Sequence, residues 1–448
     1  MIPYAASPQG AQATHTRRLA PLCALLALAL LALTPHAPGA PGAADEAPGP
    51  AFLRAEGRRE WRFPRDHGQH PAYRLEWWYY TGIVRTADGR PFGYQVTFFR
   101  QGLPRTEPGT MPGTMPGTVP GTVPGTVPGR EPRPRPERQS AWAVRSLYLA
   151  HVALSDIAAR RYRHASRAGR DSLGLSGAAP DRHTVWLGPW RADAIADDPH
   201  GVRLSVDASD FALALTLRGR GPPVLHGTDG LDRKGDAPGQ ASWYYSQPRL
   251  DTEGTLRVDG REWPVTGSTW MDHEFGTSQL GPALAGWDWL ALRLEDGSAL
   301  MLYRLRRGDG TADPASGGDW VAADGRRTRL ALGADAPAVA PESRRAAFTP
   351  GRTWRSPATG ADYPLEWQLT VPAPLQRHLA GPGATPGALT LRIAPAFDAQ
   401  EQAAGPGTPF AYWEGAVWAQ GTLSGRPVRG EGYLELTGYA GPLGGALR

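Results

Sequence analysis

The densest group of chemically competent side chains lies in the stretch Thr269-Trp270-Met271-Asp272-His273-Glu274-Phe275-Gly276, and Gly286-Trp287-Asp288-Trp289 follows closely. An apolar setting raises the pKa of a carboxyl group and keeps a proton available, so Asp272 and Glu274 beside an indole could serve as acid and base. The alternative is that they are buried carboxylates which satisfy the backbone or an arginine inside a small barrel.

The alternation of a strand decides which of these side chains can meet. If residues 269–276 form a strand, Asp272 and Glu274 share one face with Trp270, and His273 points to the opposite face. A catalytic pair on one strand face is therefore compatible with the spacing.

The elements that must position these residues are strands. Aromatic and β-branched residues predict a strand at 75–82, with Glu76 and Trp78 on one face and Trp77 on the other. Further strands are predicted at 92–99, 146–155, 202–207, 211–217, 242–247, 300–306, 365–371, 389–393, 412–417 and 432–439, and 254–263 is predicted to contain a hairpin turn at 258–261. We expect 158–199 to be loop-rich with room for a short helix, 316–327 to be a loop and 353–364 to be a turn region.

The length of 448 residues indicates two domains. Tyr73-Arg74-Leu75-Glu76-Trp77 is echoed by Tyr363-Pro364-Leu365-Glu366-Trp367, which favours two related units in tandem. We predict an N-terminal domain at 51–278 and a C-terminal domain at 279–448. Proline and glycine are too dense in the Pro-Gly-Thr repeat for a packed core, so 104–140 is predicted to be a disordered insert in the first domain.

Residues 1–44 are typical of a cleavable signal peptide with a short linker. Arg17 and Arg18 precede the apolar run 19–33, and small residues follow it. The protein is therefore expected to be exported, either to the periplasm or as a secreted protein. The single cysteine, Cys23, lies inside this segment, so the mature chain is expected to lack thiol chemistry.

Several classes of function are disfavoured by the sequence. The net charge of +5 is small for this length and the arginines are scattered, so a nucleic-acid partner is not expected. Neither a Gly-x-Ser-x-Gly elbow nor a His-Glu-x-x-His zinc sequence occurs. His67 and His70 are an isolated pair in a predicted loop. We therefore predict neither a metal nor another cofactor.

Several motifs together resemble one known family. They are Asp66-His67-Gly68, Glu76-Trp77-Trp78-Tyr79, Trp270-Met271-Asp272-His273-Glu274, Gly286-Trp287-Asp288-Trp289, Tyr412-Trp413-Glu414-Gly415 and Glu435-Leu436-Thr437-Gly438-Tyr439. This set is similar to the AttH/CrtC-like family of predicted secreted hydrolases, which is related to carotenoid 1,2-hydratase. The resemblance runs from about Phe63 onward, apart from the repeat. It implies an all-β protein with two tandem lipocalin-like antiparallel β-barrel domains.

The hydratase branch of that family adds water to an isolated double bond without a cofactor. In this chain the resemblance implies Asp272 as the acid, His273 as its partner, and aromatic rings that stabilise a cation. The catalytic candidates are Asp272, His273, Glu274 and Tyr303. The substrate-binding candidates are Glu76, Trp77, Trp78, Tyr244, Trp270, Trp287 and Trp289. The chain departs from the hydratase pattern at Phe275, where that branch has Trp, and at Leu305, where it has an acid.

Three functions are compatible with these observations. The first is an exported carrier that binds an apolar lipid or terpenoid ligand in an aromatic-lined barrel or cleft. The second is a cofactor-independent hydratase or hydrolase that acts on such a ligand at Asp272. The third is a docking module whose partner is a membrane protein of the envelope. The sequence leaves the ligand and the oligomeric state open.

Overall fold

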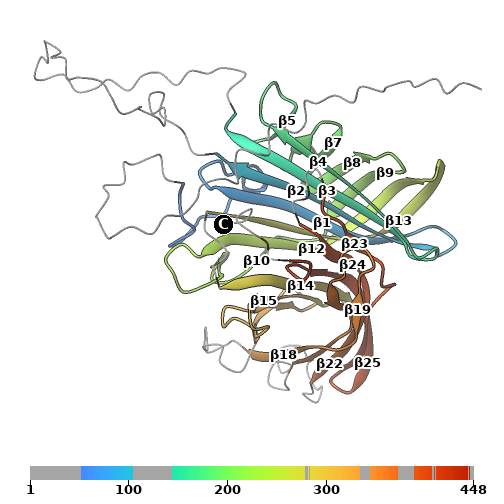
Figure 1. The fold of residues 1–448 in the computed structure, drawn as a ribbon. Coiled ribbons are helices and arrows are strands. Elements are labelled where there is room, and N and C mark those ends of the chain that lie inside the picture. The colour runs from blue at the N-terminus through green and yellow to red at the C-terminus, as the bar shows by residue number, and fades with distance from the viewer. Residues whose placement is uncertain are drawn as a thin grey trace, which may run out of the picture. The chain divides into compact units, whose positions relative to one another are not determined.

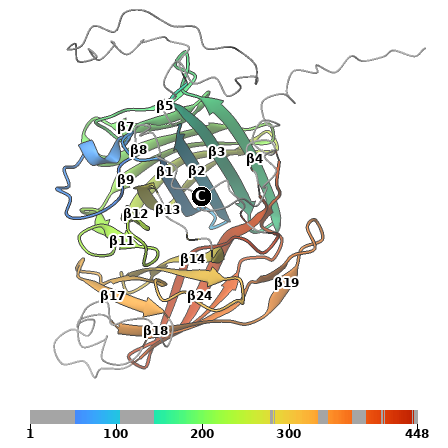
Figure 2. The same ribbon diagram turned by 60° about the vertical axis from the view of Figure 1, so that its left-hand side comes forward.

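The computed structural model describes residues 52–103, 144–277, 281, 283–332, 344–371, 388–405, 408, 410–441 and 443. The predicted signal peptide at 1–44 and the predicted insert at 104–140 lie outside these residues. Apart from the three-residue 3-10 turn η2 (Arg65–His67), all the regular elements of the described residues are strands. Figures 1 and 2 show these strands in two groups, blue to yellow-green and yellow to red.

The first sheet is formed by β1 to β13. These strands are β1 (Leu75–Arg85), β2 (Pro91–Gly102), β3 (Ser146–Asp156), β4 (Arg161–Arg170), β5 (Ser176–Ala178), β6 (Val185–Leu187), β7 (Trp190–Ile195), β8 (Asp198–Asp207), β9 (Phe211–Gly219), β10 (Val224–Leu225), β11 (Leu231–Arg233), β12 (Ala241–Val258) and β13 (Arg261–Gly276). Their order is β4-β3-β2-β1-β13-β12-β9-β8-β7-β6-β5, and β10 and β11 pair with β12. The two end strands approach each other, so this barrel is nearly closed.

The second sheet is formed by later strands. These are β14 (Leu284–Leu294), β15 (Ala299–Arg307), β16 (Gly317–Val321), β17 (Arg327–Leu332), β18 (Arg344–Pro350), β21 (Trp367–Val371), β22 (Leu389–Pro395), β23 (Glu401–Gln402), β24 (Tyr412–Leu423) and β25 (Arg426–Leu436). Pairing of β22 with both β21 and β24 closes the ring. All of its pairings are antiparallel except that of β17 with β18. A separate hairpin joins β19 (Thr353–Arg355) to β20 (Asp362–Pro364).

Each barrel has its own apolar core. Trp78, Phe92 and Leu204 are among the fully buried residues of the first core, and Trp320 and Trp367 belong to the second. A third cluster contains side chains of both sheets, including Tyr79 and Trp270 from the first and Trp289, Tyr303 and Tyr433 from the second. These apolar contacts between the sheets place the functional candidates of both barrels near each other.

The predicted fold class is confirmed, whereas two local predictions are wrong. Residues 158–199 contain β4 to β7, which the sequence analysis missed because β4 is rich in arginine and the other three strands are short. Residues 316–327 contain β16, whose five residues are all buried. A strand buried on both faces shows no alternation of polar and apolar residues, so its two glycines suggested a loop.

Among the described residues, no helix has the length and apolar character needed to span a membrane.

Candidate active site between the two sheets

Three neighbouring strands of the first sheet form one wall of the site. The register of β1 and β13 sets Trp77 opposite Glu274 and Tyr79 opposite Asp272. On the other side of β13, Tyr244 of β12 pairs with Glu274. Because directly paired residues point to the same face of a sheet, these acids and rings share one surface.

The opposing wall comes from the second sheet. The register of β14 and β15 sets Trp289 opposite Tyr303 and Trp287 opposite Leu305. Glu414 of β24 and Glu435 of β25 are also a directly paired set. This wall therefore carries two further carboxyl groups beside its indoles.

A cavity with a volume of about 110 Å³ lies between the walls. Rings from the first sheet that line it include Trp77, Tyr79, Phe99 and Tyr244, and rings from the later part of the chain include Trp287, Trp289, Tyr303, Phe410 and Tyr412. The carboxyl groups that line it are Asp272, Glu274, Glu414 and Glu435. A predominantly aromatic lining with a few convergent polar groups is typical of a small-molecule site.

Asp272 is held by three donors. Trp270 Nε1 donates to Oδ1 over 2.6 Å, Tyr244 OH donates to Oδ2 over 2.7 Å, and the Ser246 hydroxyl also donates to Oδ1. Burial raises the pKa of Asp272, although these hydrogen bonds and nearby His226 oppose the rise. The carboxyl group is thus fixed in orientation and favours its protonated form more than a solvated aspartate does.

A relay of hydrogen bonds supports Asp272 from behind. His226 Nε2 lies 2.6 Å from Ser246 Oγ, and His226 Nδ1 lies 2.7 Å from Asp319 Oδ2 of β16. Ser246 in turn donates to Asp272. Groups from both sheets therefore orient the acid on the first wall.

Glu274 lies beside a buried lysine. Lys234 Nζ is 3.4 Å from Glu274 Oε1 and 2.8 Å from Asp232 Oδ2, and it stands 4.1 Å from the centre of the Tyr303 ring. Burial raises the pKa of Glu274, and Lys234 works against this rise. Lys234 thus adds a cation to an otherwise acidic cavity.

Among the acids of the site, Glu414 and Glu435 have the most strongly raised pKa values. Burial, reinforced by the neighbouring Glu435, raises the pKa of Glu414 well above its ordinary value. Burial also raises the pKa of Glu435 to about 7, against a hydrogen bond from Trp287 Nε1 at 3.0 Å. Tyr79 OH donates to Glu414 Oε1 over 2.5 Å, and this contact joins β1 to β24.

The raised pKa of Glu435 predicts a pH-dependent stability. Between its ordinary value of 4.5 and about 7, the folded protein holds a proton that the unfolded chain releases, so stability falls as pH rises through this window. Glu435→Gln removes this cost and keeps an acceptor for Trp287. We expect the variant to be more stable than the wild type by on the order of 1–3 kcal/mol at about pH 8.

The measurement is urea unfolding of both proteins at about pH 5 and about pH 8, where the variant's advantage should be much smaller at the lower pH. Glu253→Gln, at an exposed position of β12, controls for the loss of one charge. An advantage that is equal at both pH values would contradict the prediction.

Tyr303 carries a buried hydroxyl group that lies close to Asp232. The group is buried and has no hydrogen-bond partner of good geometry among the described residues. Burial raises the pKa of Tyr303, and Asp232 adds to the rise, so the hydroxyl stays protonated and can donate to a ligand.

The hydroxyl groups of Tyr303 and Tyr79 differ in the hydrogen bonds that they make, so the same substitution at the two positions should have contrasting effects on the free energy of unfolding. Tyr303→Phe removes no hydrogen bond of good geometry, so the free energy of unfolding should change by less than about 1 kcal/mol. Tyr79→Phe removes the bond to buried Glu414 and should cost about 1–3 kcal/mol. Urea denaturation of both variants checks the prediction, and an equal cost for the two would show that Tyr303 has a structural bond.

The structure brings most of the sequence-predicted residues to one cavity. Those that line it are Trp77, Tyr244, Asp272, Glu274, Trp287, Trp289 and Tyr303. Trp270 lies among the apolar side chains between the sheets and contacts Asp272 through its indole N–H. Leu305 also lines the cavity, so an apolar side chain stands where the hydratase pattern has an acid.

Three of the predicted residues lie elsewhere, which corrects the single site drawn from the sequence. Glu76, Trp78 and His273 point to the opposite face of β1 and β13, where Trp78 belongs to the first core and His273 Nε2 contacts Glu76 Oε1 at 3.0 Å. The reason is the two-residue period of a strand, which separates neighbours in sequence onto different faces. His273 is therefore not a direct partner of Asp272.

Sequence reasoning missed Glu414, Glu435 and Lys234 as site residues. The two glutamates alternate with apolar residues in predicted strands, so the sequence indicates which side chains share a strand face with each of them. The surface that this face contacts depends on how the two barrels pack. Lys234 lies beyond β11 in a segment with no regular pattern. The sequence carries no signal that would place its ammonium group near Glu274.

The fold and the site together define a class of protein, namely one with two barrel-like β-sheets whose facing surfaces enclose an acidic, aromatic cavity. The sequence matches the model of the AttH-like family over residues 54–115 and 128–439, and the chain belongs to that family. A search of curated proteins produced no match.

Two solved structures illustrate the relationship. A Nitrosomonas europaea protein assigned to AttH is 32% identical, with 86% of this chain and 99% of that one covered and a TM-score of 0.65. Kievitone hydratase from Nectria haematococca is 16% identical, with 87% and 95% covered and a TM-score of 0.55. The second likeness extends to the fold alone.

Proposed function

We propose that the protein binds an apolar, unsaturated lipid or terpenoid ligand in the cavity and adds water to it by acid catalysis without a cofactor. The observation that carries this proposal is the convergence of four carboxyl groups from β13, β24 and β25 on an aromatic cavity, three of them buried and that of Glu435 half-buried. Aromatic walls suit an apolar ligand, whereas carboxyl groups against such walls suit proton transfer.

The chemistry follows from the two walls. The Asp272 carboxyl group donates its proton to one carbon of a double bond, and the other carbon becomes a cation. The electron-rich faces of Trp287, Trp289 and Tyr303 stabilise that cation. A water oxygen then bonds to the cationic carbon, and the Glu435 carboxylate on the opposite wall accepts the proton that the water loses. Proton exchange with solvent restores both acids, so the net change is addition of one water molecule.

Two features of the cavity support this assignment of roles. Three donors fix Asp272 on the first wall, and the pKa of Glu435 is raised to about 7, so both forms of Glu435 are populated near neutral pH. The fold is shared with a protein named as a hydratase, kievitone hydratase.

We also propose that the protein acts after export, in the periplasm or outside the cell, because the apolar run 19–33 follows Arg17 and Arg18.

The test combines ligand discovery with turnover. Organic extracts of the purified protein are analysed by mass spectrometry, and a panel of unsaturated lipids and terpenoids is incubated with the protein and searched for products heavier by one water. The proposal expects an apolar copurified ligand and at least one hydrated product. A bound ligand without any product would leave a carrier, and capture of an envelope membrane protein with no ligand bound would favour a docking module.

A further inference from the structure

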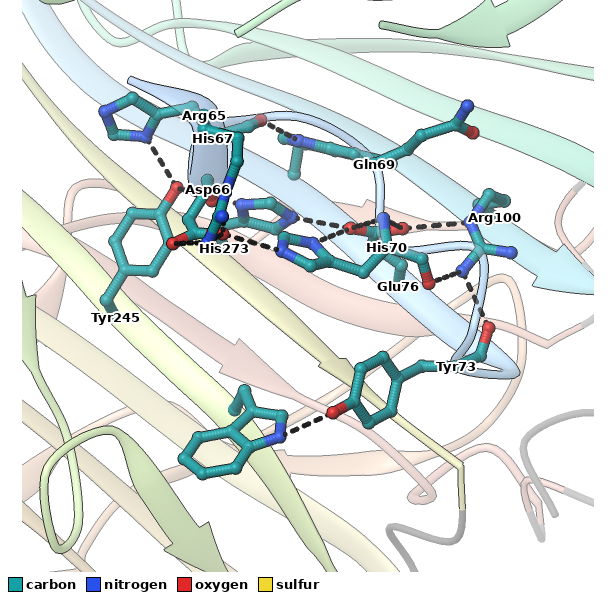
Figure 3. A network of polar contacts seen from close by, with 12 residues as sticks. Arg65, Asp66, His67, Gln69, His70, Tyr73, Glu76, Arg100, Tyr245 and His273 are labelled. Atoms are coloured by element: carbon teal, nitrogen blue, oxygen red, sulfur yellow. Dashed lines mark hydrogen bonds and ion pairs between the residues drawn. The ribbon is translucent and has the colours of Figure 1, made fainter. Parts of the chain in front are cut away.

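Three potential metal ligands converge inside the first barrel, on the face of β13 that points away from the cavity. They are His70 of the loop before β1, Glu76 of β1 and His273 of β13, and their ligand atoms lie within 4.8 Å of one another. His70 Nδ1 is 2.8 Å and His273 Nε2 is 3.0 Å from Glu76 Oε1. Figure 3 shows both imidazole rings directed at this carboxylate.

An outer layer of polar groups orients each of the three. Arg100 Nε donates to Glu76 Oε2 over 2.9 Å, and the backbone N–H of His70 lies 3.0 Å from Oε1 and 2.9 Å from Oε2, so that Oε1 faces both imidazoles. Tyr245 OH is 2.8 Å from His273 Nδ1, and Asp66 Oδ1 is 3.5 Å from His70 Nε2. Metal-bound histidines generally have such a partner on the second ring nitrogen, because it fixes the tautomer and the ring orientation.

We propose that His70, Glu76 and His273 bind a divalent transition-metal ion of the zinc type. Two imidazole nitrogens and one carboxylate oxygen are a ligand set that Zn²⁺ accepts, with the fourth tetrahedral position taken by water. Tetrahedral bonds of about 2.0–2.1 Å place ligand atoms about 3.3 Å apart. The two separations from Glu76 Oε1, 2.8 and 3.0 Å, would widen by a few tenths of an ångström, and the two imidazole nitrogens, which lie within 4.8 Å of each other, would settle at the same spacing.

The ion would stabilise the fold by cross-linking segments that are distant in the sequence. His70 and Glu76 are near in sequence, whereas His273 follows Glu76 by 197 residues, so one ion would tie the loop before β1 to two paired strands. His70 is the partly exposed member of the three, and this side offers an entry path for the ion. The role is structural and independent of the proposed hydration, since the acids of the cavity lie on the other face of β13.

The experiment is titration of metal-free, full-length protein with Zn²⁺ by calorimetry and with Co²⁺ by visible absorption. We expect one ion per chain, the visible bands of tetrahedral Co²⁺, and a rise in the thermal midpoint when Zn²⁺ is added, which a chelator reverses. His70→Gln should weaken binding at least 10–100-fold, the range observed when even an outer partner of a ligand is removed.

Two control variants test whether Zn²⁺ binding is specific to the three proposed ligands, and one spectroscopic measurement identifies the ligands directly. His164→Gln on β4 and His200→Gln on β8 remove an exposed and a half-buried histidine outside the set and should bind Zn²⁺ like the wild type. If His70→Gln does not fold, X-ray absorption of the zinc-loaded wild type should show two imidazole ligands. Absence of binding to the folded wild type, full binding by folded His70→Gln, or a zinc shell without imidazole would each overturn the proposal.

Discussion

Asp272→Asn is expected to reduce the turnover of a hydrated substrate by about 10²–10⁴-fold, the contribution typical of a positioned general acid. Asparagine has nearly the same shape and still accepts a hydrogen bond from Tyr244 or Trp270, but it has no acidic proton to give to a double bond. The effect should therefore appear in kcat, while the affinity for the ligand changes little. Steady-state kinetics and equilibrium binding with the same ligand measure the two quantities separately.

The control for this substitution lies on the same strand. Glu262 is exposed near the start of β13, and Glu262→Gln should retain wild-type turnover. A thermal melt establishes that Asp272→Asn is folded. If the folded variant hydrates the substrate at the wild-type rate, the acid is a different residue, and the proposed role of Asp272 is wrong.

Arg100→Met is expected to lower the free energy of unfolding by about 3–5 kcal/mol. Arg100 and Glu76 form an ion pair in which neither side chain is more than 1% exposed. Arg100 Nη2 also donates to the backbone oxygens of His70 and Tyr73, at 2.9 and 2.8 Å. Methionine keeps the aliphatic stem but leaves the carboxylate of Glu76 buried without its cation. Urea unfolding in the presence of a chelator gives the value free of any bound metal.

Two further proteins test the cause of this loss. The double variant Arg100→Met with Glu76→Gln should recover part of it, because the uncompensated charge is gone. Arg220→Met breaks the exposed pair with Asp251 on the same barrel and should cost no more than about 1 kcal/mol. A loss in Arg100→Met as small as that in Arg220→Met would show that the buried pair contributes little.

The side-chain alternation of strands made much of one wall predictable from the sequence. It separated Asp272 and Glu274 from His273 correctly, and it placed Trp77 on the face opposite Glu76 and Trp78. The fold class followed from the repeated aromatic strands and from the family resemblance. Strands that lack alternation, such as β16, or that are rich in arginine, such as β4, could not be recognised in this way.

The second wall could not be predicted, because it depends on how two barrels meet. Glu414 and Glu435 lie more than a hundred residues beyond Asp272, and no local pattern states that their face covers that of β13. The same is true of His70, Glu76 and His273, whose spacing matches no metal-binding sequence pattern. The echo of Glu76-Trp77 in Glu366-Trp367 supported tandem barrels, yet Trp77 lines the cavity whereas Trp367 is buried in the second core.

The division of strands between the sheets also has a consequence for biosynthesis. Every strand of the first barrel ends by Gly276, and every strand of the second begins at or after Leu284, whereas the Tyr79–Glu414 bond joins residues 335 positions apart. Domains generally fold as units during synthesis, and contacts between distant residues form late. The first barrel can therefore close while its aromatic wall is still uncovered. An arrested or truncated chain would expose this aromatic surface to other molecules. We therefore expect chains that lack the second barrel to aggregate and to have no partial activity.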